Sequence, residues 1–395
     1  MIPLPDRETG PPAGSLLIVT RNFPPVIGGI ERVVAEAARA LSRHFRVVVL
    51  GPAGGEAATD SGIDYRPVSP VPGSRFLRVT RQLAPRIARE LRPVAVLAGS
   101  GVMAPAARAA ARAAQCPAWA LVHGLDVTAR HPLYRILFAP AIRGLDGVLA
   151  NSRATARAAR RLGVLEERIG EIALGVDLPA WPPAADRRAR IRHAWGVPEE
   201  AHLLLFVGRL TQRKGIGPFV EKGLAPLVGA DPGIHLAVVG AAPARALGRV
   251  AVPPEELVRR AKRAGVGAHV HLVGPLTGQT LDEAYFASDL FVFPVLERPG
   301  DMEGFGLVAL EAAAHGLATV AFATGGIPDA VSDPESGDLV PPGDYAAMRQ
   351  AIRRRLGQDP VVRAAATRRF AGTRSWSRFA GELETWVLAR LPPGS

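Results

Sequence analysis

The chain has 395 residues, of which 48% are hydrophobic and 21% are charged, so its size and composition fit a globular protein of two or three domains. Its single cysteine, Cys116, excludes a disulfide framework and fits a reducing compartment. Its formal net charge of +12 comes almost wholly from arginine, and no apolar run reaches the roughly 18 residues that a membrane-spanning helix needs.

In chain order, the first segment, 1–14, is rich in proline and charge and lacks the apolar core of a signal peptide. We therefore expect a disordered start and a cytoplasmic protein. Beyond it, short apolar runs alternate with longer amphipathic segments, a rhythm that predicts a parallel sheet with helices on both faces. The expected strands of this first half are 15–20, 46–51, 94–99, 118–124 and 146–152, and the expected helices are 29–44, 75–91, 104–115 and 153–163.

A proline-rich region at about 177–190 breaks both patterns, after which the alternation resumes. The second set of strands is expected at 202–208, 235–240, 269–274, 289–294 and 318–323, with a final amphipathic helix at 375–391. The predicted fold class is therefore α/β, with two doubly wound, Rossmann-like domains whose strand ends face each other across a cleft. The expected division is an N-terminal domain at 15–180, a linker at 181–195, a C-terminal domain at 196–372 and a C-terminal helix at 373–395.

Ligands of open parallel sheets bind beyond the carboxyl ends of the strands, and the notable residues of this sequence lie there. Gly28 and Gly29 follow the first strand and open the first helix, where backbone amides can approach an anion. The pair is not a G-x-G-x-x-G fingerprint, and no acidic residue ends the second strand, which counts against a dinucleotide dehydrogenase.

The second half begins with the segment FVGRLTQRKG, in which Gly208 and Arg209 follow a strand and Lys214 comes five residues after Arg209. An arginine and a lysine in such a loop suit a diphosphate, with the guanidinium as a forked donor and the ammonium as a point charge. A solvated basic loop is the alternative interpretation.

The segment EGFGLVALEAAAHG places Glu303 just before an expected helix and Glu311 about two turns into it. The helix start near Phe305 would offer free amides to phosphate oxygens, and carboxylates are good acceptors for pairs of sugar hydroxyls. A partner for the helix dipole is an alternative role for Glu303, but it does not explain Glu311.

Together these motifs resemble the family-4 retaining glycosyltransferases of the GT-B fold over nearly the whole chain. The opening TRNFPPVIGGIERV and the stretch ERPGDMEGFG are similar to the phosphatidylinositol-mannosyltransferase branch. The motifs that carry the wider resemblance, in order, are Gly28-Gly29, His123-Gly124-x-Asp126, Gly208-Arg209, Lys214-Gly215, Glu303-x7-Glu311, Gly325-Gly326-Ile327-Pro328-Asp329 and LVPPGD at 339–344.

The resemblance implies a role for each matching residue of the donor site. Arg209 and Lys214 would clamp the donor diphosphate, Glu311 would accept hydrogen bonds from the ribose, and Glu303 would hold the sugar hydroxyls. Gly208 belongs to the same donor site. The backbone groups that the resemblance adds to the donor site are those of Phe305, Gly306 and Leu307 at the phosphates and sugar, and those of Val273 and Gly274 near the base.

The resemblance also assigns residues to the first domain. Gly28 and Gly29 would approach the β-phosphate, His123 would lie beside the reacting sugar, and the C-terminal helix around Trp376 would cross back to this domain. A core or capping histidine is the alternative for His123. The family's Asn-Gly-Val-Asp begins here with Leu174, which puts one hinge contact in doubt.

No Asp-x-Asp occurs, so the pattern of metal-dependent transferases is missing and no metal or other cofactor is expected. No motif supplies the pair of a nucleophile and an acid that retaining glycosidases use. We therefore expect metal-independent front-face substitution, in which the leaving phosphate oxygen accepts the proton of the acceptor.

The predicted function is transfer of a hexose from a nucleotide-diphosphate sugar to a lipid-linked or glycan acceptor in cell-envelope polysaccharide or glycolipid synthesis. GDP-mannose is favoured as the donor by the branch resemblance, with a UDP-sugar next. A nucleotide-sugar epimerase or phosphorylase is an alternative that the Glu303-x7-Glu311 motif disfavours. A non-enzymatic basic surface-binding protein is a third reading, and it leaves the order of the motifs unexplained.

The excess of arginine has three explanations: genomic base composition, an anionic membrane surface or nucleic acid. An aromatic fraction of 6%, with no aromatics among the basic stretches, argues against nucleic acid. The expected helix at 75–92 carries six arginines among apolar residues and is the candidate for peripheral contact with the inner face of the cytoplasmic membrane, with a solvated face as the alternative.

Overall fold

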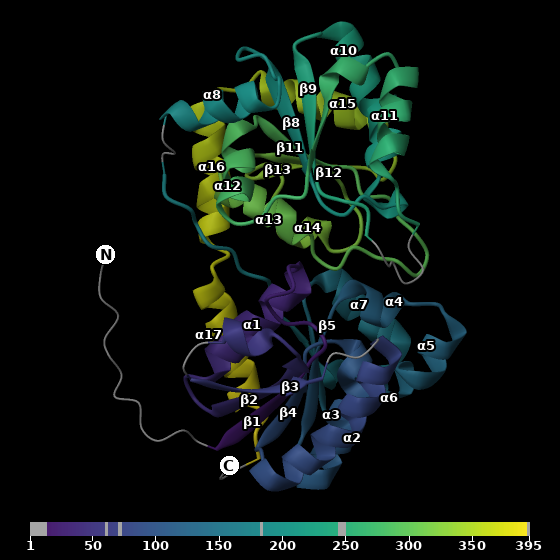
Figure 1. Cartoon of the computed structure of the whole chain (residues 1–395), viewed down its shortest axis with the longest axis vertical. Coiled ribbons are helices and arrows are strands. Elements are labelled where there is room, and N and C mark those ends of the chain that lie inside the picture. Colours follow the sequence, from purple (N-terminus) through teal and green to yellow (C-terminus); the bar gives the residue numbers. More distant parts are fainter. Residues whose placement is uncertain (1–13, 60–61, 70–72, 182–184, 244–249, 393–395) are drawn as a thin grey trace. The chain divides into compact units, whose positions relative to one another are not determined.

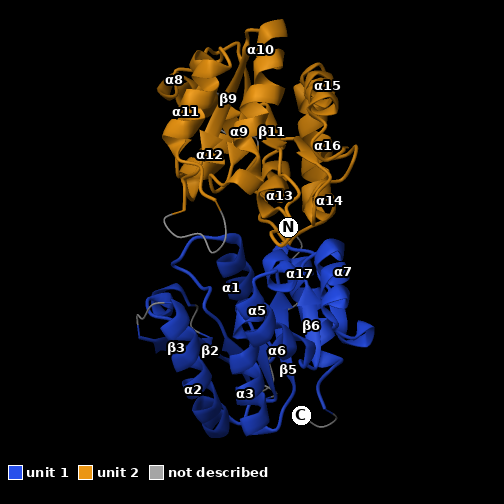
Figure 2. Cartoon of the chain, turned by 90° about the vertical axis from the view of Figure 1, so that its right-hand side faces the viewer, with its two compact units in different colours: residues 1–174, 376–395 blue, residues 175–375 orange. Residues whose placement is uncertain are grey.

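The computed structural model describes residues 14–59, 62–69, 73–181, 185–243 and 250–392. They form two compact units (Figure 2). Unit 1 contains the chain up to Leu174 together with Trp376–Ser395, and unit 2 contains Gly175–Ser375. The expected disordered start, 1–14, lies outside the described residues except for Gly14.

Unit 1 is built on a seven-stranded parallel sheet in the order β3-β2-β1-β4-β5-β6-β7 (Figure 1). Strands β4, β5 and β6 of this sheet are buried along their whole length, as a parallel sheet with two covered faces requires. The strands are β1 (Ser15–Val19), β2 (Arg46–Pro52), β3 (Ile63–Val68), β4 (Ala95–Ala98), β5 (Ala118–Val122), β6 (Gly147–Ala150) and β7 (Ile169–Glu171).

The helices of unit 1 connect these strands, and the last helix of the chain joins them. The helices are α1 (Gly29–Leu41), α2 (Gly73–Leu91), α3 (Ala104–Ala114), α4 (Gly124–Thr128), α5 (Pro132–Leu137), α6 (Ala139–Arg143), α7 (Arg153–Leu162) and α17 (Trp376–Leu388). Helix α1 packs beside α17, while α2, α3 and α6 lie next to one another in that order (Figure 1).

Helix α17 completes the core of unit 1, although it lies about 200 residues beyond the rest of that unit in the sequence. Its apolar side buries Phe379, Leu383 and Val387. The ring of Trp386 meets the edge of Trp119 at 5.4 Å between centroids. The same ring lies over β6 and β7, where a Cβ on Gly147 or Gly170 would come within 2.5 Å of it.

Unit 2 is built on a six-stranded parallel sheet in the order β10-β9-β8-β11-β12-β13. The strands are β8 (His202–Val207), β9 (Ile234–Val239), β10 (Val270–Gly274), β11 (Leu290–Phe293), β12 (Thr319–Phe322) and β13 (Gly337–Val340). The helices are α8 (Ala185–Ala194), α9 (Ile216–Phe219), α10 (Ala225–Ala230), α11 (Pro254–Arg263), α12 (Gln279–Ala287), α13 (Leu307–Ala314), α14 (Ile327–Ala330), α15 (Tyr345–Leu356) and α16 (Pro360–Gly372).

The region expected to be a linker, 181–195, differs from that expectation because most of it is helix α8 of unit 2. The prolines of the region precede the helix and do not interrupt it. Arg192 of α8 is 1% exposed, and its guanidinium donates to Asp289, which also accepts a hydrogen bond from the Leu203 amide at the start of β8. This buried ion pair fixes α8 to the sheet, so the segment is part of the domain.

Candidate functional site

The expected donor-site residues of unit 2 lie at the carboxyl ends of its strands, in the loops that follow them and in helix α13. Because all six strands are parallel, these loops meet at one edge of the sheet, where ligands of doubly wound folds bind. The loop after β8 carries Arg209 and Lys214, and the loop after β11 carries Glu303 and leads into α13.

Two glycines allow these loops to approach each other closely. Gly215 has a φ of +73°, and a Cβ there would lie 1.8 Å from the carbonyl oxygen of Pro294 in the loop after β11. Gly240, after β9, has a φ of +140°, and its Cβ would lie 2.0 Å from the carbonyl oxygen of Gly208. Only glycine fits such positions, so the sequence brings Lys214 against the loop that holds Glu303.

Lys214 is buried beneath this edge of the sheet, with 7% of its surface exposed. Its Nζ donates to Glu303 Oε2 at 2.8 Å and lies 4.7 Å from the centre of the Phe293 ring. Burial lowers the pKa of Lys214 to about 8, although the Glu303 carboxylate opposes this shift. The ammonium group is therefore charged at neutral pH but titrates close to it.

Glu303 is the centre of a small buried ion-pair network. Its Oε2 accepts from both Lys214 and Arg213, and the guanidinium of Arg213 also reaches Asp301 at 3.2 Å. Burial alone would raise the pKa of Glu303, but Lys214 and Arg213 overcome this effect and hold the pKa well below its usual range. The carboxylate is thus ionised in the folded protein.

Sequence reasoning missed Arg213 as a member of this site. The side chain is 4% exposed, and the two carboxylates Glu303 and Asp301 raise the pKa of its guanidinium against the effect of burial. The sequence could have indicated Arg213 through its charges, because the two carboxylates of Asp301 and Glu303 need more than one cation if they are buried together.

Helix α13 begins directly at the network. Phe305 is buried, Gly306 has a φ of +95° and precedes the helix, and Leu307 is its first residue. A Cβ on Gly306 would lie 2.9 Å from the Phe293 ring, which also lies under Lys214. The amide of Ala309 donates to the Gly306 carbonyl oxygen at 2.8 Å. The first amides of a helix otherwise have no acceptor within it, so this end can bind anions beside the Lys214 ammonium.

Glu311 lies further along α13 and is half-buried. The Tyr285 hydroxyl lies 3.2 Å from Glu311 Oε2 and 3.3 Å from the carbonyl oxygen of Val308, and it donates toward both. Burial raises the pKa of Tyr285 well above its ordinary value, so this hydroxyl stays protonated and orients the carboxylate. Arg209 is exposed in the loop after β8, near enough to help lower the pKa of Lys214.

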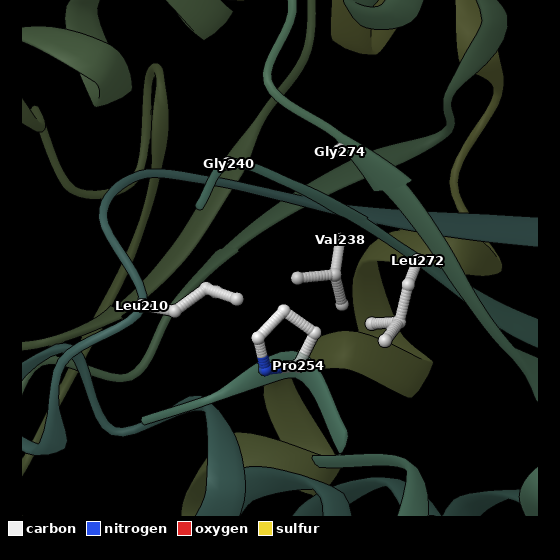
Figure 3. Close-up of a pocket in the computed structure, with 6 residues that line it drawn as sticks. All are labelled: Leu210, Val238, Gly240, Pro254, Leu272 and Gly274. Carbon is white, nitrogen blue, oxygen red and sulfur yellow. The ribbon is translucent and has the colours of Figure 1, made fainter. Parts of the chain in front are cut away.

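A cavity of about 160 Å³ opens at the same edge of the sheet (Figure 3). The loop after β8, the carboxyl ends of β9 and β10 and the start of α11 form its walls, and Gly274 is the one expected base-site residue among them. Val273 is not part of the lining. The side chains that face the cavity are apolar, so it suits a flat apolar or aromatic group; the lining residues are Leu210, Val238, Gly240, Pro254, Leu272 and Gly274.

In unit 1, His123 follows β5 and is 7% exposed. Its Nε2 lies 3.3 Å from the carbonyl oxygen of Gly99, and its Nδ1 lies 3.4 Å from Asn151 Nδ2, an arrangement that fits a ring protonated at Nε2. The Asp126 carboxylate accepts from the His123 amide at 2.9 Å and so caps helix α4. The histidine is held in one orientation at the carboxyl end of the sheet.

Gly28 and Gly29 are exposed at the start of α1. The Glu31 carboxylate accepts from Asn22 Nδ2 at 2.6 Å, and a Cβ on Gly28 would lie 2.2 Å from this carboxylate. The small residue therefore leaves room for a side chain that closes the β1–α1 loop. These glycines and His123 belong to unit 1, whereas the Lys214–Glu303 network and Glu311 belong to unit 2.

In the part of the chain that the structure describes, no group of three or more candidate ligands is placed to hold a metal ion. Over the same residues, no helix combines the length and apolar character needed to cross a bilayer.

Two Rossmann-like units, each built on a parallel sheet with polar side chains at the carboxyl ends of its strands, are the architecture of GT-B glycosyltransferases. A family model described as "Glycosyltransferase Family 4" matches residues 27–179, and one described as "Glycosyl transferases group 1" matches residues 201–358. The chain therefore belongs to the family-4 glycosyltransferases of the GT-B fold, as the sequence motifs predicted.

Curated relatives include the D-inositol 3-phosphate glycosyltransferases of Thermomonospora curvata and Geodermatophilus obscurus. The first is 35% identical over 59% of this chain and 54% of its own length, and the second is 37% identical over 60% and 51%. The chain thus spans about half the length of the curated relatives it matches. These names differ from the phosphatidylinositol-mannosyltransferase branch, so that narrower assignment stays a prediction.

Among solved structures, Anabaena HepE in complex with UDP-glucose superposes with a TM-score of 0.76 at 18% identity, over 95% of this chain and 100% of that chain. A glycosyltransferase from Rickettsia africae gives the same TM-score and identity, over 94% and 98%. At this level of identity the likeness concerns the fold.

Proposed function

We propose that the chain transfers a hexose from a nucleotide-diphosphate sugar, with retention at the anomeric carbon and without a metal ion. The observation that carries this proposal is the Lys214–Glu303–Arg213 network against the start of α13. A cation and a helix N-terminus lie beside an ionised carboxylate there, so one group of residues can meet both the diphosphate and the sugar.

In this proposal Arg209, Lys214 and the first amides of α13 bind the diphosphate and stabilise its charge as it leaves. Such preorganised donors typically lower the barrier by a few kcal/mol each. Glu303 accepts from a sugar hydroxyl, Glu311 accepts from the ribose, and the apolar cavity beside Gly274 receives the base. His123 is assigned to the reacting sugar, and the leaving phosphate oxygen takes the acceptor's proton.

The donor is proposed to be GDP-mannose or a UDP-sugar. The branch resemblance favours GDP-mannose, whereas the solved complexes of Anabaena HepE contain UDP or UDP-glucose. Thermal unfolding with a panel of nucleotide sugars would separate them, because a ligand at 100 times its dissociation constant adds about 2.7 kcal/mol to stability. The proposal expects one nucleotide class to raise the melting temperature clearly above the others.

The acceptor is proposed to be lipid-linked or a glycan. D-inositol 3-phosphate is a second candidate, because several relatives at about half-length coverage carry it in their names. Transfer assays with each acceptor, followed by NMR of the product's anomeric configuration, would identify the acceptor and test retention. An inverted product would contradict the mechanism.

Replacement of the two donor-loop cations tests the site itself. Arg209→Ala and Lys214→Ala should each reduce turnover by roughly 100-fold, because each removes a charge aimed at the leaving diphosphate. Lys262→Ala is a matched control, because this exposed lysine lies on α11 away from the loop. Near-native turnover in both site variants would refute the assignment of these two residues. Loss of activity after divalent metal ions are removed with EDTA would refute the metal-independent mechanism.

A further inference from the structure

Helix α5 of unit 1 exposes three large aliphatic side chains. Leu133, Ile136 and Leu137 are 61%, 70% and 58% exposed, and no residue of this helix is fully buried. Their spacing of three and four places them on one face of the helix. Single exposed aliphatic residues are common, but three on one face of a six-residue helix indicate a surface that contacts another phase or molecule.

The other face of α5 anchors the helix to unit 1. The Tyr134 hydroxyl donates to the carbonyl oxygen of Asp126 at 2.9 Å, and the Tyr134 and Phe138 rings pack at 4.9 Å. Burial raises the pKa of Tyr134 far above its ordinary value, so the hydroxyl remains a donor. The aliphatic face is therefore held outward by a fixed support, at the margin of the unit in Figure 1.

The surroundings of α5 are strongly basic. Arg130 and Arg135 are exposed at and within the helix, and α6 next to it adds Arg143. Helices α3 and α2 continue this layer beyond α6. From Gly73 to Gly144 the chain has only two carboxylates, Glu90 and Asp126, against these arginines: Arg75, Arg78, Arg81, Arg86, Arg89, Arg92, Arg108, Arg112, Arg130, Arg135 and Arg143.

The structure gives the segment 75–92, the expected membrane-contact helix, a different role. The apolar side of α2 faces the protein: Phe76 is buried, and Leu83 and Ile87 are half-buried where α2 packs on α3. Its arginines point to solvent. Helix α2 can therefore supply charge to a membrane surface but no side chains that insert, whereas α5 has aliphatic side chains free to insert.

We propose that α5 docks unit 1 onto an anionic lipid bilayer, with Leu133, Ile136 and Leu137 inserted among the headgroups and acyl chains and the arginine layer bound to lipid phosphates. Aliphatic side chains and a one-signed basic surface together match such a bilayer, because insertion and attraction to anionic lipids add. A protein partner or a second copy would need carboxylates to meet the same arginines. Membrane docking rests on the proposed function in one respect only: it would bring the protein to a lipid-linked acceptor in the same bilayer.

Vesicle cosedimentation of the full chain, without donor or acceptor, tests the proposal. The protein should bind phosphatidylglycerol-containing vesicles and not pure phosphatidylcholine vesicles. Leu133→Gln/Ile136→Gln/Leu137→Gln should weaken binding by on the order of 1000-fold, since each inserted aliphatic side chain contributes on the order of tenfold. Arg130→Gln/Arg135→Gln should weaken it by roughly tenfold and reduce its dependence on salt.

Val361→Gln/Val362→Gln is the matched control, because these two valines are 74% and 68% exposed on α16 of unit 2. This variant should bind vesicles as the unchanged protein does. Unchanged binding by the triple α5 variant would overturn the proposal. The proposal would also be overturned if the triple variant still bound vesicles but no longer self-associated in sedimentation velocity. The aliphatic face would then contact a second copy of the chain.

Transfer to a water-soluble acceptor distinguishes this inference from the proposed function. The α5 variants should keep that activity, since none of the replaced residues belongs to the donor or sugar site. Loss of vesicle binding with transfer intact supports the docking surface, whereas absence of transfer in the unchanged protein counts against the function and not against docking.

Discussion

At Lys214, burial and the Glu303 carboxylate act in opposite directions on one ammonium group. Burial is the larger effect and lowers the pKa from 10.5 to about 8. Between these two values the unfolded chain binds more protons than the folded chain, so this group's contribution to stability rises with pH from about 8 to 10.5. In the folded protein the Lys214 ammonium therefore loses its proton, and with it its positive charge, at a lower pH than a free lysine does, and it lies where the diphosphate is proposed to bind.

We therefore expect the affinity for a nucleoside diphosphate to fall as the pH rises from 7 to 9, because the neutral amine no longer attracts the anion. Isothermal titration calorimetry with UDP and GDP at several pH values measures this change. Lys214→Arg keeps its charge over the whole range and should bind with little dependence on pH. A flat profile in the unchanged protein would show that Lys214 does not meet the phosphates.

Arg213 acts through Glu303, and its replacement separates positioning from binding. Arg213→Gln should reduce stability by about 3 kcal/mol, because it leaves the half-buried carboxylates of Glu303 and Asp301 with one cation fewer. Turnover should fall more than nucleotide affinity, since Glu303 is assigned to the sugar and not to the phosphates. Arg213→Lys should restore part of the turnover.

The control for this change is Arg259→Gln, because Arg259 is 63% exposed in its pair with Glu256. Exposed pairs contribute little, so this variant should match the unchanged protein in thermal unfolding and in turnover. Equal effects of the two replacements would argue against a role for Arg213 at Glu303.

At the scale of elements, the start of α13 depends on the conformation of one residue. Gly306→Ala should cost about 1–2 kcal/mol from the positive φ alone, and the clash with Phe293 should add to this and displace the helix start. Nucleotide affinity should fall with it. Gly278→Ala is the control, because Gly278 also has a positive φ and precedes helix α12, but its Cβ would meet no atom within 4 Å.

The Gly278 variant should lose stability without losing affinity in a combined thermal-shift and calorimetric comparison. If both alanine variants bind nucleotide as the unchanged protein does, the amides of α13 are not part of the donor site.

The elements that the sequence predicted are those with continuous apolar runs, such as β1 and β8. Strands β3, β7 and β13 lack such runs: β3 carries Asp64 and Arg66, β7 has three residues and β13 begins Gly337-Asp338, so periodicity does not predict them. Helix α8 was also missed, because its neighbouring prolines dominate a local reading while its stability comes from the distant Asp289. Periodicity detects apolar cores and does not detect edge strands or helices fixed by tertiary ion pairs.

The candidate site shows the same division. Sequence motifs predict Lys214 and Glu303 as site residues, yet their contact spans 89 positions of the sequence and depends on the fit of Gly215 against Pro294. The place of Arg213 in the network follows only from that contact. Residue types could be predicted from the sequence, but the ion pairs between them required the fold.

At the scale of the whole molecule, the residues proposed to bind the donor lie in unit 2 except for Gly28, Gly29 and His123, while the core of unit 1 includes a helix from the far end of the sequence. Leu383→Ala should destabilise the protein by about 2–5 kcal/mol, because this side chain is fully buried in α17. Nucleotide affinity below the melting temperature should be nearly unchanged, because most residues proposed to bind the nucleotide belong to the other unit. Thermal unfolding with and without nucleotide measures both quantities, and lost affinity in the folded variant would show that the two units are coupled in donor binding.

The split composition of unit 1 also determines the order in which the ribosome can finish each unit. Domains generally acquire their structure as their residues emerge, the N-terminal one first. Here Trp376–Leu388 are synthesised only after all of Gly175–Ser375, so the earlier unit stays without its last helix until the later one is complete. Until then Trp119 and the glycine faces of β6 and β7 have no tryptophan against them, and nascent chains halted between the two segments should be captured by chaperones through this apolar face.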